Sequence, residues 1–212
     1  MTFSLPPEIQ REVAALTTRY GAPPLFAEPG YDDYLHTIDM RKRPGEVCMV
    51  IRRPNGRLIT STKTFYPDDA YRLPTGGIHP GEPIYDALLR ETQEETSLTV
   101  EVRRFLAIIR YQADAASPLP ANSSALVADG LYLFTTYAFL LDEIGGELHA
   151  EDETERIAGF HEVAVDELPT LADRLERVVA PQSNADRTYG NWEAWGRFRA
   201  ITHRAVWQAL QG

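Results

Sequence analysis

The alternation of hydrophobic and polar positions predicts a sheet whose strands are interrupted by helices. Residues 46–53 form a short apolar run, the Asn55-Gly56 pair is typical of a hairpin turn, and residues 57–65 supply the return strand. Other segments rich in β-branched and aromatic residues, or alternating loosely, are also predicted strands: residues 34–43, 98–112, 131–141 and 157–165.

Helical spacing of apolar residues appears at both ends of the chain and between the predicted strands. The segments with this spacing, or with helix-start prolines, are residues 6–20, 83–96, 166–175 and 188–210. Residues 21–33 hold several prolines and glycines and predict a loop. The order of hairpin, helix, strands and helix indicates an α/β fold, a mixed sheet with helices on its faces.

A chain of 212 residues suits one α/β domain with added segments. We assign residues 1–33 to an N-terminal helix and Pro-rich loop, residues 34–178 to the main domain, and residues 179–212 to a C-terminal helical extension packed on that domain. The aromatic residues of this extension favour a core role over a cofactor site. Those expected to be exposed on it suggest a homodimer.

The chain carries 31 acidic and 21 basic residues, a formal net charge of −10. This charge argues against general nucleic-acid binding, and it repels an anionic small molecule unless a bound cation such as Mg²⁺ reverses the local sign. We find no apolar run of about 18 residues and no secretory signal, so we expect no membrane partner. The single cysteine, Cys48, excludes an internal disulfide. Together these features favour a cytoplasmic location.

Acidic residues of the helix predicted at 83–96 continue its apolar face instead of lying opposite it. Glu91 and Glu95 fall in the same angular sector as Leu88, with Glu94 at the edge of that sector. Carboxylates three and four residues apart on a helix repel each other unless a cation lies between them. Carboxylate oxygens are ligands that Mg²⁺ prefers, so the pattern predicts a Mg²⁺ site.

The stretch from residue 76 to residue 98 resembles the Nudix box, the loop–helix motif of the Nudix hydrolases. The residues that match this motif in register are Gly76, Glu82, Arg90, Glu91, Glu94, Glu95 and Leu98. Thr92 replaces an aliphatic residue of the motif, and Ser97 replaces its closing glycine. We therefore expect the geometry of the helix end to differ from the family pattern and metal binding to be retained.

The resemblance implies an α/β/α sandwich around a mixed sheet, with added N- and C-terminal helices here. It also implies an Mg²⁺-dependent hydrolase, with Mn²⁺ as a substitute ion, that cleaves the phosphoanhydride bond of a nucleoside diphosphate linked to another moiety. The implied metal ligands are Glu91 and Glu95, assisted by Glu94 and by the backbone carbonyl of Thr75. The residues that would orient these ligands are Gly76, Glu82 and Arg90.

Hydrolysis also needs a general base and groups that contact the substrate phosphates. The candidates for the base are Glu94 in the box and Glu153 and Glu155 in the acidic loop before the strand at 157. The candidates for phosphate contacts are Arg52, Arg72 and Arg110. Each arginine also fits an ordinary surface charge, and the acidic loop also fits a solvated loop.

Three alternatives remain open at this point. The same fold can bind a nucleotide or a metal as a regulator without turnover, although a chain without activity has no need of all three box glutamates. It can also catalyse another reaction of a diphosphate ester, such as isomerisation. Finally, the acidic helix can be a structural element of an interaction domain.

Overall fold

The computed structural model describes residues 6–28, 42–112, 133–179 and 191–212. The strands in these ranges are β1 (Leu25–Glu28), β2 (Gly45–Arg52), β3 (Leu58–Lys63), β4 (Thr75–Ile78), β5 (Leu98–Gln112), β6 (Leu133–Gly146) and β7 (Ile157–Val163). They form one seven-stranded sheet in the order β1-β5-β6-β2-β3-β7, with β4 paired to β2. The sheet is mixed, because β1 with β5 and β2 with β6 run parallel while the other pairs run antiparallel.

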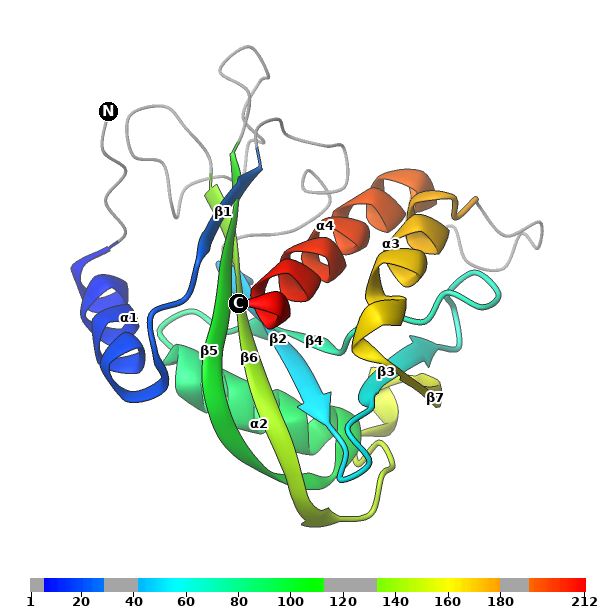
Figure 1. Cartoon of the computed structure of the whole chain (residues 1–212), viewed down its shortest axis with the longest axis horizontal. Coiled ribbons are helices and arrows are strands. Elements are labelled where there is room, and N and C mark those ends of the chain that lie inside the picture. Colours follow the sequence, from blue (N-terminus) through cyan, green and yellow to red (C-terminus); the bar gives the residue numbers. More distant parts are fainter. Residues whose placement is uncertain (1–5, 29–41, 113–132, 180–190) are drawn as a thin grey trace.

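Helices cover both faces of this sheet, which confirms the α/β/α sandwich (Figure 1). The α-helices are α1 (Pro7–Tyr20), α2 (Ile84–Thr96), α3 (Leu168–Glu176) and α4 (Trp192–Gln211), and short 3₁₀ turns cover Glu153–Glu155 and Val165–Glu167. α1 and α2 pack on one face, and α3 and α4 pack on the other. None of the helices in the described ranges is long and apolar enough to cross a membrane.

Strand β2 shows how the two hydrophobic cores arise from one apolar run. Val47 and Met49 belong to the core under α1 and α2, whereas Cys48 and Val50 belong to the core under α3 and α4. All four are fully buried. Successive side chains of a strand point to opposite faces, so a central strand with both faces covered needs a continuous apolar sequence.

The aromatic residues of α4 belong to the core under α3 and α4. Trp192, Trp195 and Phe198 are all buried. The helix approaches α3 closely at Gly196, where a Cβ atom would lie 2.0 Å from the carbonyl oxygen of Leu175. The predicted core role of these aromatic residues is therefore confirmed, and the homodimer stays a prediction.

Two short strands, β1 and β4, were not predicted from the sequence. β1 lies within the segment predicted as a Pro-rich loop, and β4 has the sequence Thr-Gly-Gly-Ile. β6 also continues to Gly146, five residues beyond its predicted end at 141. The strand predicted at residues 34–43 lies mainly outside the described residues.

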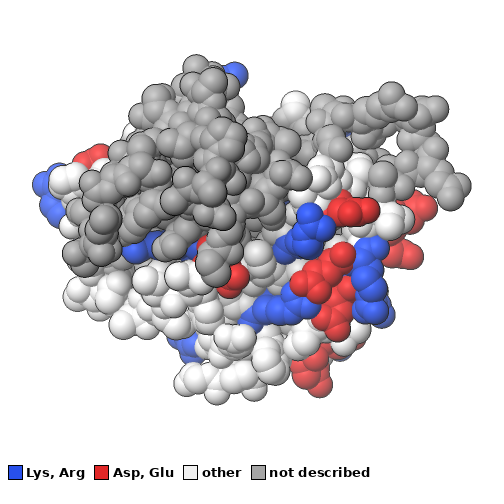
Figure 2. Space-filling model, turned by 90° about the horizontal axis from the view of Figure 1, so that it is seen from above, with Lys and Arg blue, Asp and Glu red and all other residues white. Residues whose placement is uncertain are grey.

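Basic and acidic side chains lie interleaved on the face of the molecule shown in Figure 2. Arg204 of α4 pairs with Asp173 and Glu176 of α3 at 2.8 and 2.5 Å, and these ion pairs join the two helices. Mixed charge of this kind differs from the continuous basic surface that nucleic-acid binding needs.

Candidate active site

Gly76 allows the side chain of Glu91 to lie directly against strand β4. Gly76 pairs with Val47 of β2, which fixes β4 beneath helix α2. A Cβ atom on Gly76 would lie 1.9 Å from Cδ of Glu91, so no larger residue fits without displacing that carboxyl group. Glu91 is 6% exposed. The glycine that starts the box therefore creates the space for one of its glutamates.

Burial changes the acidity of Glu91. Loss of solvent raises the pKa of its carboxyl group to about 7, and the neighbouring charge of Glu95 acts in the same direction. The hydrogen bond from Arg90 acts in the opposite direction. A bound cation would stabilise the ionised form that burial disfavours.

Glu95 is the most deeply buried of the three helix glutamates. It is 0% exposed, and within the described part of the chain neither of its carboxylate oxygens accepts a hydrogen bond. The ammonium nitrogen of Lys63 lies 3.2 Å from its Oε1, and a guanidinium nitrogen of Arg72 lies 4.0 Å away. Burying a carboxylate with so few partners is costly, so these two oxygens fit a site for a further cation.

Arg90 ties the loop of the box to its helix. Its guanidinium donates to both carboxylate oxygens of Glu82, at 2.7 and 2.8 Å, and to the carbonyl of Gly77 at 2.9 Å. It also donates to Glu91 at 2.8 Å and to Glu94 at 2.9 Å. The hydrogen bond to Glu82 is the main cause of a raised pKa for Arg90. Arg90 thus holds Glu82 and the two helix carboxylates in one network.

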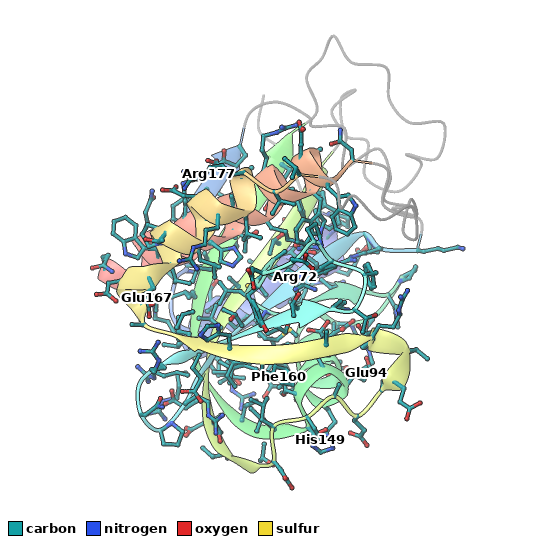
Figure 3. The ribbon with its side chains drawn as sticks, turned by 90° about the vertical axis from the view of Figure 1, so that its right-hand side faces the viewer. Arg72, Glu94, His149, Phe160, Glu167 and Arg177 are labelled. Carbon is teal, nitrogen blue, oxygen red and sulfur yellow. The ribbon has the colours of Figure 1, made fainter. Side chains whose placement is uncertain are left out.

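Glu94 differs from the other two helix glutamates. Its side chain is 34% exposed and pairs with Arg90. Glu94 lies near the C-terminal end of α2 and is labelled in Figure 3. Within the described ranges, no group of three His, Cys, Asp or Glu side chains is arranged to hold a metal ion. Mg²⁺ commonly takes only one or two protein carboxylates and keeps several waters. The two buried acids, Glu91 and Glu95, suit that mode.

Arg72 is a buried residue that supports the segment before the box. It is 2% exposed and lies inside the molecule in Figure 3. It donates to the hydroxyl of Thr75 at 3.1 Å, the carbonyl of Leu73 at 2.8 Å and the hydroxyl of Tyr66 at 3.0 Å. Thr75 is itself buried at the start of β4. The alternative that Arg72 is an ordinary surface charge is therefore wrong, and its contact with substrate stays a prediction.

Two other arginines predicted to contact phosphates lie on other parts of the sheet. Arg52 is the last residue of β2, whereas β4 pairs with the opposite end of β2. The Nε of Arg52 donates a hydrogen bond to Asp142 at 2.8 Å. Arg110 lies on β5, which β6 separates from β2. The structure does not bring either residue into the network around Arg90.

The acidic loop contributes one residue to the cluster. Glu155 Oε2 accepts a hydrogen bond of 2.5 Å from Lys63, whose ammonium also faces Glu95. Burial raises the pKa of the Glu155 carboxyl, but the charge and hydrogen bond of Lys63, together with the neighbouring carboxyl of Glu95, lower this pKa below its usual value. Glu153 is exposed. Lys63 was not predicted as a site residue, because its only signal in the sequence was a cation near the end of a strand.

The two departures from the box motif have local explanations. Thr92 is buried, and its hydroxyl donates to the carbonyl of Leu88 at 2.7 Å, so its polar atom is satisfied inside the helix. Ser97 adopts the left-handed conformation with φ of 54°, and its N–H caps the carbonyl of Gln93. It thus occupies the backbone conformation that glycine favours at a helix end.

Comparisons with known proteins identify the family of this chain. The family model of the NUDIX domain matches residues 42–182, more than half of the chain. An ADP-ribose pyrophosphatase of Methanocaldococcus jannaschii is 28% identical over 130 residues, which cover 61% of this chain and 67% of that protein. An RNA pyrophosphohydrolase of Cereibacter sphaeroides is 30% identical over 154 residues, which cover 68% of this chain and 94% of that protein.

Among solved structures, an ADP-ribose pyrophosphatase from Streptococcus suis aligns with 16% identity and a TM-score of 0.44, over 79% of this chain and 92% of that one. The match of the family model and the relative at 30% identity establish the family. The chain belongs to the Nudix family, as a Nudix-type hydrolase.

Proposed function

We propose that the protein is an Mg²⁺-dependent pyrophosphohydrolase that cleaves the phosphoanhydride bond of a nucleoside diphosphate linked to another moiety, with Mn²⁺ as a substitute ion. The observation that carries this proposal is the buried carboxylate of Glu95, whose oxygens accept no hydrogen bond in the described part of the chain. A structural acidic helix would expose such a group, or pair it fully.

The residues that would hold the ion are Glu91 and Glu95, with the backbone carbonyl of Thr75 and assistance from Glu94. Glu91 fits this role because Gly76 leaves room for its carboxylate beside the strand, and because burial leaves its charge undercompensated. A bound divalent ion would neutralise phosphate oxygens and lower the pKa of an attacking water.

The remaining residues would orient the ligands and handle the proton. Arg90 fixes Glu91 by a 2.8 Å hydrogen bond and is itself fixed by Glu82. Glu155 is the better placed candidate for the general base, because Lys63 keeps it ionised beside Glu95. An ionised carboxylate next to the ligand cluster can accept the proton of the attacking water. Exposed Glu153 has no such contact among the described residues.

A product assay tests this proposal. The full chain is incubated with Mg²⁺ and with ADP-ribose, 5′-triphosphate RNA, sugar nucleotides, dinucleoside polyphosphates, nucleoside triphosphates or CoA, and the phosphate-containing products are identified. The first two substrates follow the names of the relatives. We expect cleavage of the phosphoanhydride bond in one class and loss of cleavage when EDTA removes the ion.

The matched variants are Glu95→Gln at the site and Glu101→Gln, an exposed residue of β5. Glu95→Gln should lower kcat by about 100-fold or more with the fold intact, because the amide is a weaker ligand. Glu101→Gln should retain the activity of the wild-type protein. A near-normal kcat for Glu95→Gln rejects the assignment, and Mg²⁺ binding without any product favours a non-catalytic regulator.

A further inference from the structure

Lys63 places a positive charge inside the acidic site. It ends β3, and its side chain is only 12% exposed. Its ammonium nitrogen lies 3.2 Å from Oε1 of Glu95 and 2.5 Å from Oε2 of Glu155. One cation thus bridges an acid of the box helix and an acid of the loop before β7.

Arg72, the other cation near Glu95, is held in place by hydrogen bonds to other residues. Arg72 is 4.0 Å from Glu95, and it donates hydrogen bonds to Tyr66, Leu73 and Thr75. Lys63 has the shorter contact and a flexible four-carbon stem, so its ammonium can move while the strand stays in place.

We propose that Lys63 is a tethered counter-ion of the acidic site, which neutralises Glu95 and Glu155 in the metal-free protein and yields Glu95 to a divalent ion. This inference rests on the proposed metal site. Two cations on one carboxylate repel each other at short range, so an incoming ion must displace the ammonium from Glu95. Lys63 then loses its contact with Glu95 and keeps only its hydrogen bond to Glu155. The residue therefore weakens metal binding while it holds the candidate base in position.

Calorimetric titration of the chelator-treated full chain with MgCl₂, in the absence of substrate, tests this inference. Lys63→Met should bind Mg²⁺ about tenfold more tightly than the wild-type protein, or better, because a competing charge has been removed. Lys63→Arg keeps the charge and should bind Mg²⁺ with an affinity close to the wild-type value. Arg103→Met is the matched control, since Arg103 pairs with Glu101 and Asp142 elsewhere on the surface.

The outcomes separate the inference from the proposed function. If the wild-type protein binds Mg²⁺ and Lys63→Met binds it equally or more weakly, the inference is wrong and the metal site stands. If the wild-type protein binds no Mg²⁺, the metal site fails and the inference fails with it. Circular dichroism first checks that each variant is folded. If Lys63→Met is unfolded, Lys63→Gln keeps a hydrogen-bond donor without the charge and must show the same gain in affinity.

Discussion

His203 of α4 accepts a hydrogen bond from the backbone N–H of Leu73 at 2.9 Å, across 130 positions of sequence. Because its Nε2 is the acceptor, its Nδ1 carries the proton and donates to the carbonyl of Arg199 at 2.7 Å. The imidazole is therefore neutral and fully paired. Through this contact helix α4 holds the backbone at Leu73, two residues before Thr75, the first residue of β4.

This contact predicts a stability that depends on pH. Burial lowers the pKa of His203 from 6.5 to about 4. A lower pKa in the folded state means that the unfolded chain binds the proton more tightly, so the stabilisation is complete above pH 6.5 and is lost as the pH falls toward 4. We expect His203 to account for a loss of about 3 kcal/mol in the free energy of unfolding across this window.

Urea unfolding of the wild-type protein and of His203→Gln at several pH values between 7 and 4 checks this prediction. Glutamine can accept the N–H of Leu73 with its amide oxygen and does not titrate. The slope of stability against pH should therefore be smaller in His203→Gln. Equal slopes would show that His203 does not titrate with folding.

Gly76→Ala should displace Glu91 and weaken the site. The new methyl group would overlap the Glu91 carboxyl group, because the Cβ position lies 1.9 Å from Cδ of that side chain. We expect Mg²⁺ affinity to fall by about 10- to 100-fold, as when the support of a metal ligand is lost. Gly145→Ala is the control, since among the described residues its Cβ would meet Thr99 alone, at 3.9 Å. Calorimetry that shows equal Mg²⁺ affinity for both variants would contradict this assignment.

Arg90→Lys should separate charge from geometry in the box. Lysine keeps one positive charge but cannot reproduce the paired hydrogen bonds to Glu82 together with those to Gly77 and Glu91. We predict a fall in kcat of about 10- to 100-fold. Steady-state kinetics at saturating Mg²⁺ gives the measurement. Wild-type kcat in this variant would show that charge alone is sufficient.

Ser97→Gly should stabilise the protein. Ser97 has φ of 54°, and its buried hydroxyl has no hydrogen-bond partner among the described residues. Glycine removes both costs, and we expect a gain of about 1 kcal/mol in the free energy of unfolding. Ser97→Ala removes only the hydroxyl, so thermal unfolding should rank Ser97→Gly above Ser97→Ala. The reverse order would contradict the strain that we assign to this position.

Periodicity predicted the long elements because each buries a continuous face. The helix of the box is an example: Leu88, Glu91 and Glu95 were predicted on one side, and all three are buried. β4 was missed because its glycine pair has low strand propensity. Gly76 of β4 pairs with β2 and also leaves room for the side chain of Glu91, a contact that no local pattern contains.

The support of the site was less predictable than its motif. Lys63 and Glu155 are 92 positions apart, and His203 reaches Leu73 across 130 positions. Such contacts arise only when β3, the loop before β7 and helix α4 pack together. Arg72 shows the same limitation, because its sequence neighbourhood is that of a polar loop although the side chain is buried in the fold.

The most direct test of the metal site is a crystal structure of the protein soaked in MnCl₂, with anomalous data recorded at the manganese edge. We predict an anomalous peak bound by Glu91 and Glu95, near the carbonyl of Thr75. The ammonium of Lys63 should then contact Glu155 and no longer Glu95. Fully ordered acids with no peak between them, and Lys63 still on Glu95, would contradict the account.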